Sequence, residues 1–477
     1  MFADSDPEMP DTVLLTSLSP ARRRVAFYVL LVGAIMPPLN VFIVTIALPE
    51  IRATLNASAS ETGLIVSGYA SAYAVCLITG GRLGDLFGRR FIFLVGMAGF
   101  TVTSFLAGVA PSAELLVIFR VFQGATAAMM APSVLAALRS LFREQDVPWA
   151  LNVYGIGIGV AVAGGQFLGG ILLAANLWGL GWRSAFLINV PAGLLLLFAA
   201  PFLVPESGGQ EKPRLDLIGV VLLTTALGSL VFALSVGRDQ HWASWVIALI
   251  ALSPVLIIGF FSYERALTRR HGMPILDAAL LKVRRFRRGL LVALLFFFTS
   301  PFYLFFSIYL QAGLGQGALA AGLAVLPYGV ANFLAPMLAT RAPASWRRYF
   351  FGIGMAVEIL GYACVGFCGA TQTGGAALFA VLFIGGFGQG IAMPEMIHTI
   401  LADVPHQYTG LAAGIMNSTL QIGSAVSVAG ASGLFFTVLG EGTSAAAYGT
   451  AFAIVMATVV AALTLSMSLG LWNERAA

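Results

Sequence analysis

Long apolar stretches, separated by short segments rich in charge, glycine or proline, dominate the pattern of the chain. The hydrocarbon core of a bilayer is about 30 Å thick and a helix rises about 1.5 Å per residue, so a spanning helix needs roughly 20 apolar residues. Fourteen stretches reach about this length, and the pattern therefore predicts an all-α polytopic membrane protein with 14 transmembrane helices. They lie near residues 26–49, 62–80, 91–110, 115–137, 150–174, 185–204, 216–236, 243–262, 288–310, 318–340, 350–369, 375–398, 410–437 and 448–470.

The stretches fall into two groups of six with an additional pair between them. Membrane transporters are often built from repeated halves, with the substrate site near the bilayer midplane between the halves. We therefore predict two six-helix bundles joined through an inserted two-helix hairpin. The predicted divisions are a tail at 1–25, an N-terminal bundle at 26–204, the hairpin with a basic loop at 205–287, a C-terminal bundle at 288–470 and a tail at 471–477.

Composition and charge support a membrane protein with a defined orientation. The chain is 59% hydrophobic and 10% charged, whereas soluble domains carry roughly 25% charged residues, which excludes an ordinary soluble enzyme. With a cytoplasmic N-terminus, 22 of the 26 Lys and Arg residues fall on the cytoplasmic side, as the positive-inside rule requires. We expect both termini to be cytoplasmic in the cell inner (plasma) membrane. The net charge of +5 then needs no nucleic-acid partner.

A charged, glycine-rich decapeptide, Gly81 to Arg90, links the second and third predicted helices. It is similar to the loop of the major facilitator superfamily with the pattern G-x-L-a-D-r-x-G-r-r, although Leu86 stands where a basic residue is usual. The resemblance implies a cytoplasmic gate. Its predicted members are Gly81, Asp85, Gly88, Arg89 and Arg90. Alternatively, the arginines only fix orientation and bind anionic lipid headgroups.

Further segments resemble one branch of this superfamily, the fourteen-helix drug:proton antiporters. The segments are Leu39 to Pro49, Leu116 to Gly124, Gly165 to Gly170, Trp182 to Pro191 and Tyr309 to Gln311. The resemblance implies efflux of small amphipathic compounds in exchange for protons by alternating access. A proton-linked carrier of one specific metabolite remains the alternative.

Arg120 lies within an apolar run, where a charged side chain must face protein or water. In the resembling branch this arginine, followed by Gln123 and Gly124, is associated with proton coupling. The alternative is a structural role in which the guanidinium ties backbone carbonyl groups together.

Proton coupling also needs a group that can gain and lose a proton. Relatives often carry an aspartate at the position of Asn40, but an amide does not titrate. The deep acids of this chain are Glu358 and Glu395, and a low dielectric favours the uncharged form of a carboxyl group. We slightly favour Glu395 because Pro394 precedes it and weakens the helix. Glu395 and His398 together supply too few ligands for a metal, so no metal site is expected.

Polar and aromatic side chains within the predicted spans are candidates for a substrate cavity. They are Asn40, Tyr73, Gln123, Gln166 and Gln311. Gln166 stands where the resembling family has the proline of a Gly-Pro pair. The sequence shows neither a nucleotide-binding P-loop nor a cluster of catalytic polar residues, so we expect no enzyme and no cofactor. The expected partners are a small-molecule substrate, protons and membrane lipid, and we expect a monomer.

Overall fold

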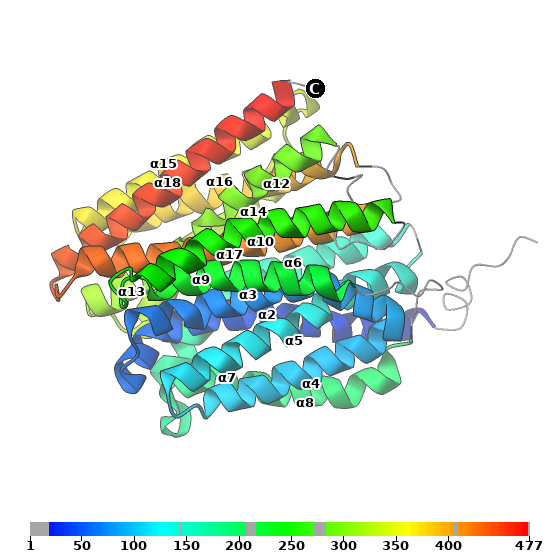
Figure 1. The fold of residues 1–477 in the computed structure, drawn as a ribbon, viewed down its shortest axis with the longest axis horizontal. Helices are drawn as coiled ribbons and strands as arrows, with labels where there is room; N and C mark the ends of the chain where they lie inside the picture. Colours follow the sequence, from blue (N-terminus) through cyan, green and yellow to red (C-terminus); the bar gives the residue numbers. More distant parts are fainter. Residues whose placement is uncertain are drawn as a thin grey trace, which may run out of the picture.

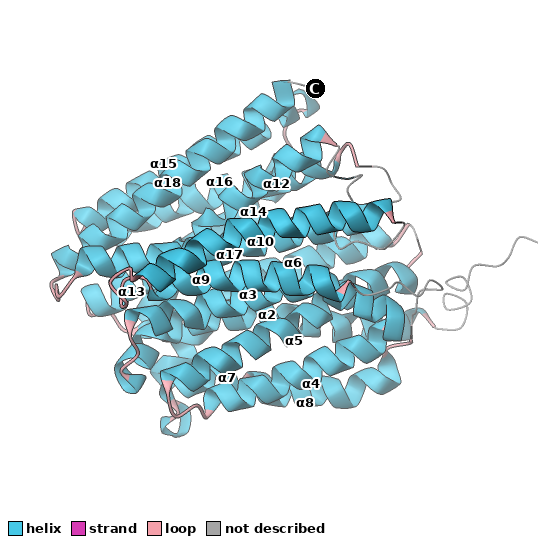
Figure 2. Cartoon of the chain, in the orientation of Figure 1, coloured by secondary structure: helices cyan, strands magenta, loops and turns pink. Residues whose placement is uncertain are grey.

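The computed structural model describes residues 19–143, 145–206, 216–270, 280, 283–404 and 409–475, and its regular elements over these residues are helices (Figures 1 and 2). Every predicted apolar stretch lies in one helix or in two or three consecutive ones. The long helices are α2 (Pro20–Leu55), α3 (Ala59–Phe87), α4 (Arg89–Gly108), α5 (Ala113–Leu141), α6 (Val147–Ala175), α8 (Asn189–Leu203), α9 (Leu217–Val236), α10 (Ser244–Arg269), α12 (Arg284–Phe296), α14 (Ala318–Ala339), α15 (Arg347–Ala370), α16 (Gly375–Leu401), α17 (Thr409–Leu439) and α18 (Ala445–Arg475).

Several helices extend beyond the predicted ends. α2 begins before residue 26, and α10 continues to Arg269. The prediction followed hydrophobicity and stopped at charged residues, but a helix can continue into the headgroup region with charged side chains. The stretch 288–310 is divided by a short 3₁₀ turn, Phe297–Thr299, before α13 (Ser300–Ile308), and it ends in a π-helical turn, Tyr309–Gly313.

The expected count of fourteen spanning helices is only partly reached. Twelve helices of the described part are long and apolar enough to cross a membrane, and the bent pair within α6 adds a thirteenth if it is one span. α3 is not among them, although it has 29 residues. It packs against α5, α9 and α17, and Phe87 at its end is the one exposed residue among those described in this helix.

The helices before residue 204 pack mainly on one another, and so do the helices after residue 284. The strongest contacts in the first set join α3 and α5, α4 and α5, and α2 and α6; in the second they join α15 and α16, α14 and α16, and α15 and α18. The two sets meet along two seams, between α3 and α17 and between α6 and α14. The start of α2 and the end of α18 lie at the same end of the molecule (Figure 1), here called the tail end. The opposite end, where α2 leads into α3, is called the far end.

The hairpin of α9 and α10 lies beside the first of these seams. α9 packs against both α3 and α17. Ala70, Val231, Ala425 and Ala429 form one buried cluster at this place, with contributions from all three helices. The hairpin therefore bridges the two sets of helices.

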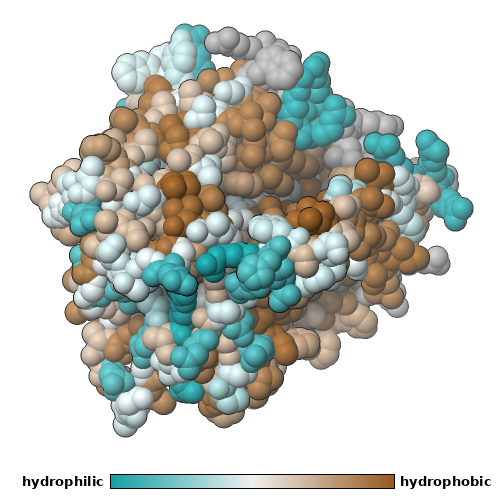
Figure 3. Space-filling model, turned by 60° about the vertical axis from the view of Figure 1, so that its left-hand side comes forward, coloured by the Kyte–Doolittle hydropathy of each residue, from teal (hydrophilic) through white to brown (hydrophobic). Residues whose placement is uncertain are grey.

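Large hydrophobic side chains remain exposed along the sides of the molecule. Phe198, Leu195 and Phe367 are 73%, 67% and 67% exposed. In the space-filling view, which turns the far end towards the reader, hydrophilic side chains gather near the middle of that end and hydrophobic colouring continues along the flanks (Figure 3). This distribution fits a multi-pass membrane protein whose sides face lipid.

Candidate functional site

Arg120 is the centre of a fully buried polar cluster formed by α2, α3, α4 and α5. Its side chain is 0% exposed, and its Nε donates a hydrogen bond of 2.9 Å to the carbonyl oxygen of Ile65. Its Nη1 donates to Asn40 Oδ1 at 2.8 Å and to Gln123 Oε1 at 2.7 Å. The guanidinium also lies over the Tyr69 ring, with Cζ 4.1 Å from the ring centroid. The structure therefore brings three predicted site residues, Arg120, Asn40 and Gln123, into direct contact.

The neighbours of this cluster are neutral and hold it in place. Gln123 Nε2 donates a hydrogen bond of 2.7 Å to Ser104 Oγ on α4. Asn40 Nδ2 reaches the carbonyl oxygen of Ala185 at 3.4 Å, which is a long hydrogen bond. A glycine at position 124 lets α5 lie against the backbone of α3 at Tyr69. This close approach places Arg120 beside Ile65, one turn away on each helix.

Glu358 lies among the C-terminal helices, and its side chain is also 0% exposed. Neither carboxyl oxygen has a hydrogen-bond partner among the described residues. The backbone of Glu358 lies directly against Gly388 of α16. An isolated buried carboxyl group is costly as an anion.

Aromatic and amide side chains near Glu358 form a second polar cluster that sequence reasoning missed. The hydroxyl groups of Tyr328 and Tyr362 are 2.6 Å apart. Gln389 Oε1 accepts hydrogen bonds from Tyr303 Oη at 3.5 Å and from Asn332 Nδ2 at 3.3 Å. Tyr303 also packs edge-on against Phe42 of α2, with ring centroids 4.9 Å apart. The cluster therefore reaches the contact between the two sets of helices.

The two polar clusters occupy corresponding positions in their helix pairs, and the sequence contains a signal of this correspondence. Gln123 and Gln389 are each followed by a glycine, and these glycines lie against the backbone of Tyr69 and of Asn332, respectively. One turn earlier, Arg120 bonds to the Ile65 carbonyl group, while Gly386 lies against the Tyr328 carbonyl group. α3 with α5 therefore corresponds to α14 with α16. Only the first pair carries the arginine.

The other predicted proton carrier, Glu395, occupies a different environment. It lies near the tail-end terminus of α16 and is half-buried, and α16 continues through Pro394 to Leu401. His398 is exposed. Glu395 is therefore outside the polar cluster that surrounds Glu358.

The segment Gly81 to Arg90 was expected to be a loop, and this expectation is wrong. α3 continues through Phe87, and α4 begins at Arg89. Gly88 alone forms the turn, with φ of +96°, a backbone conformation that side-chain-bearing residues rarely adopt. Gly81 and Asp85 are therefore helical, and the side chain of Asp85 lies outside the described part of the structure.

Arg90 ties this turn to α8 within the first set of helices. Its Nε lies 3.4 Å from Glu206 Oε2, and its backbone N–H donates a hydrogen bond of 3.0 Å to Glu206 Oε1. Its Nη1 donates to the carbonyl oxygens of Pro201 and Val204. These contacts connect α4 to the end of α8 and not to the second set of helices.

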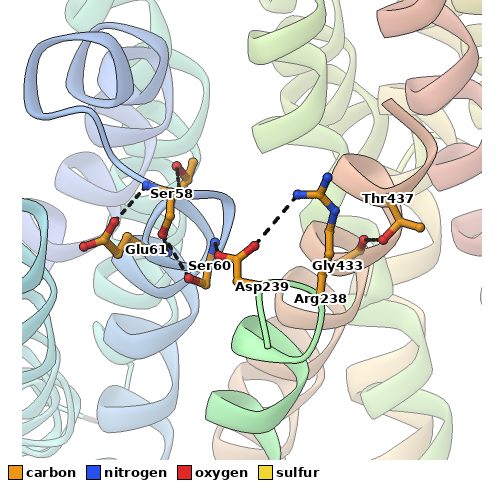
Figure 4. Close-up of polar contacts among 8 residues, drawn as sticks. Ser58, Ser60, Glu61, Arg238, Asp239, Gly433 and Thr437 are labelled. Atoms are coloured by element: carbon orange, nitrogen blue, oxygen red, sulfur yellow. Dashed lines mark hydrogen bonds and ion pairs between the residues drawn. The ribbon is translucent and has the colours of Figure 1, made fainter. Parts of the chain in front are cut away.

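Polar contacts also connect separate elements at the far end. Gln311 Nε2, in the π-helical turn, donates a hydrogen bond of 3.0 Å to the Ile46 carbonyl oxygen of α2, across the two sets of helices. Arg52 lies over the Phe436 ring of α17 at 4.4 Å. Figure 4 shows the start of α3, where Ser58 and Glu61 form a capping box and Asp239 of the hairpin accepts a hydrogen bond from Ser60 N. Of these contacts, those of Gln311 and Arg52 connect the two sets of helices at the far end.

The remaining cavity candidates lie apart from one another. Gln166 is 0% exposed, and neither side-chain polar atom has a hydrogen-bond partner among the described residues. Tyr73 is half-buried and stacks on Tyr69, with centroids 6.2 Å apart and ring planes at 20°. An apolar groove of about 280 Å³ lies between α15 and α18, and none of the predicted cavity residues lines it.

Many spanning helices, two buried ionisable centres and two seams between sets of helices are the architecture expected of a membrane transporter. The family profile of the Major Facilitator Superfamily matches residues 30–428, and the chain belongs to this family.

Similar proteins include a "Probable actinorhodin transporter" from Streptomyces coelicolor, 35% identical over 431 residues, which are 89% of this chain and 74% of that protein. A "Tetracenomycin C resistance and export protein" from Streptomyces glaucescens is 32% identical over 83% of this chain and 73% of its own length. The "Multidrug efflux pump LfrA" from Mycolicibacterium smegmatis is 31% identical over 87% of this chain and 81% of its own length.

Solved structures of other transporters share the fold. A bacterial homologue of the human lysosomal transporter Spinster, in an inward-facing and unoccupied conformation, matches with a TM-score of 0.65, 14% identity and coverage of 96% of this chain and 98% of that chain. A POT family transporter in complex with 5-aminolevulinic acid matches with a TM-score of 0.66, 14% identity and coverage of 94% and 96%. At this level of identity the likeness concerns the fold alone.

Proposed function

We propose that the protein exports small amphipathic compounds in exchange for protons, with Glu358 as the proton carrier. The observation that carries the proton site is the isolation of this carboxyl group: it is fully buried and lacks hydrogen-bond partners among the described residues. Such a group is stable when protonated, and it can ionise only when water or a partner reaches it. Export is supported by the relatives, whose names describe transport, export, resistance and efflux.

In this proposal Arg120 belongs to the substrate site. It lies in the first set of helices, whereas Glu358 lies in the second, so proton binding and substrate binding can be assigned to different halves. Asn40 and Gln123 contact Arg120 directly and become substrate-site residues together with Tyr73. Gln166 lies at the seam between α6 and α14, and Gln311 bonds to α2 across the two sets of helices, so in this proposal both respond to the relative motion of the halves.

The arrangement in the membrane completes the proposal. We assign fourteen spans, with α3 counted as one because it is long and enclosed by other helices, in two bundles, 26–204 and 288–470, with the hairpin inserted between them. The arginines at the starts of α2, α4 and α12 and at the end of α10 lie at the tail end, which supports a cytoplasmic assignment for that end by the positive-inside rule. We assign the protein to the inner membrane as a monomer. The turn at Gly88, with Gly81, Asp85, Arg89 and Arg90, belongs to the cytoplasmic gate.

The test measures proton-driven transport in proteoliposomes. It compares the native protein with the variant Glu358→Gln and with Glu395→Gln as the matched control. A panel of fluorescent lipophilic compounds of anionic, neutral and cationic charge supplies the transported probe. We expect a pH gradient with an acidic lumen to drive uptake of the probe into the proteoliposomes by the native protein and by Glu395→Gln. Glu358→Gln should lose this drive but keep exchange of labelled for unlabelled probe. Gradient-driven accumulation by Glu358→Gln would refute the assignment of the proton site, and no transport of any probe by the native protein would refute the proposed function.

A further inference from the structure

The Arg120 guanidinium is a buried cation whose described contacts are all with neutral groups. Its hydrogen-bond acceptors are one backbone carbonyl oxygen and two side-chain amide oxygens, and its ring contacts are Tyr69 and Phe186. No ion pair with Arg120 occurs within the part of the chain that the structure describes. Neutral dipoles compensate a buried charge only in part. An anionic group that reached this point would therefore be strongly attracted to it.

Asn40 occupies the position that such an anion would take. Its Oδ1 lies 2.8 Å from Arg120 Nη1, within the range of a charge-assisted hydrogen bond. Its Nδ2 is held only by the 3.4 Å contact to the Ala185 carbonyl oxygen, which is long for a hydrogen bond. The amide can therefore turn away at small cost when another oxygen takes its place.

Two tyrosines extend from the guanidinium towards the tail end along one face of α3. Tyr69 lies under Arg120, and Tyr73 follows one helical turn later with its ring nearly parallel to that of Tyr69. Tyr69 is 4% exposed, whereas Tyr73 is half-buried and thus more accessible. Flat aromatic molecules stack on such surfaces, and an acidic group at one end of the molecule would then face Arg120.

We propose that Arg120 binds the acidic group of a planar aromatic substrate, whose ring system stacks along Tyr69 and Tyr73 after the Asn40 amide turns away. This inference rests on the proposed function and specifies the substrate class: planar aromatic acids in their anionic form. A lipophilic cation is disfavoured at the same place because it would meet a like charge without a carboxylate to offset it.

Equilibrium binding to the purified full chain in detergent tests the proposal without depending on transport. The probes are anthraquinone-2-carboxylate and its uncharged isostere, anthraquinone-2-carboxamide, each titrated at a pH where the acid is ionised. The native protein should bind the acid at least roughly tenfold more tightly than the amide, since a charge-assisted hydrogen bond is stronger than a neutral one. Equal binding of the two probes, or tighter binding of the amide, would overturn the proposal.

Asn40→Asp is the decisive variant because it changes one side-chain group without changing its shape. The new carboxylate pairs with Arg120 internally, so the ratio of acid to amide affinity should fall to about one, as it should in Arg120→Gln. Arg183→Gln is the control: Arg183 also bonds a backbone carbonyl oxygen, that of Ala110, but it lies outside the cluster, and this variant should keep the native ratio.

The outcomes separate the inference from the proposed function. An Asn40→Asp protein that melts at the native temperature and still prefers the acid would refute the inference, because the internal carboxylate would then fail to compete. If the native protein exports neutral or cationic members of the panel but shows no acid preference, the substrate class is wrong and the exporter function stands.

Discussion

The contact between Gly124 and α3 gives a direct measure of how helix packing sets the position of Arg120. In Gly124→Ala the added Cβ would overlap the Tyr69 carbonyl group and lie 3.0 Å from its carbon and 3.1 Å from Tyr69 Cα. Ordinary contacts begin near 3.4 Å, so the carbon contact alone requires a movement of about 0.4 Å (3.4 − 3.0), and the closer carbonyl oxygen requires the backbone of α3 to move further than this. Overpacking of this kind costs about 1–3 kcal/mol. A movement of this size would lengthen the 2.9 Å bond from Arg120 to the Ile65 carbonyl oxygen beyond roughly 3.3 Å and weaken it.

The matched control is Gly228→Ala on α9, where an added Cβ meets no atom within 4 Å. Thermal unfolding can be monitored by size-exclusion chromatography of heated samples. The midpoint temperature of unfolding should be lower for Gly124→Ala than for the native protein, and unchanged or higher for Gly228→Ala. Transport by Gly124→Ala should fall as well, because the Arg120 cluster is displaced. If the two alanine variants were equally stable, the packing argument and the geometry derived from it would be wrong.

Two further changes test contacts at the two ends of the molecule. The Arg90–Glu206 ion pair is 33% and 41% exposed, so a double-mutant cycle of Arg90→Gln and Glu206→Gln should give a coupling free energy below about 1 kcal/mol, and a value of several kcal/mol would contradict this. Gln311→Ala removes one hydrogen bond between the halves at the far end, worth about 0.5–1.5 kcal/mol. Spin labels can be attached at Thr54→Cys and Glu441→Cys after the native cysteines are replaced. In Gln311→Ala the distribution of distances between the two labels should shift towards longer distances. An unchanged distribution would show that this bond does not favour closure.

The positions of the helices were predictable because each needs a long apolar run, and these runs are visible in the sequence. The burial of Arg120 was predictable for a related reason, since a charged group in an apolar run has no stable place against lipid. The turn at Gly88 was not, because charge and glycine content suggested a loop of ten residues, whereas one glycine with positive φ suffices. The status of α3 as an enclosed helix depends on its neighbours, which the sequence does not reveal.

The environment of Glu358 shows where sequence reasoning reached its limit. Pro394 favoured Glu395, but the structure leaves that residue half-buried and continues α16 through the proline. The spacing of four residues places Tyr362 on the same face of α15 as Glu358, but Tyr328 comes from α14, and the sequence does not reveal how α14 packs against α15. The pair Gln389 and Gly390 was an available signal, since it repeats Gln123 and Gly124 and indicates corresponding positions in the two halves.

The inserted hairpin makes the two sides of the transporter unequal towards lipid. α9 covers the seam between α3 and α17, whereas the seam between α6 and α14 has no such covering helix among the described contacts. A compound dissolved in the membrane would meet a closed wall on the hairpin side. The seam between α6 and α14 is closed by backbone contacts at Gly170 and Gly322, so if it opened it would open directly to lipid. We therefore expect a bulky label at this seam to reduce transport and the same label on α10 to leave it unchanged.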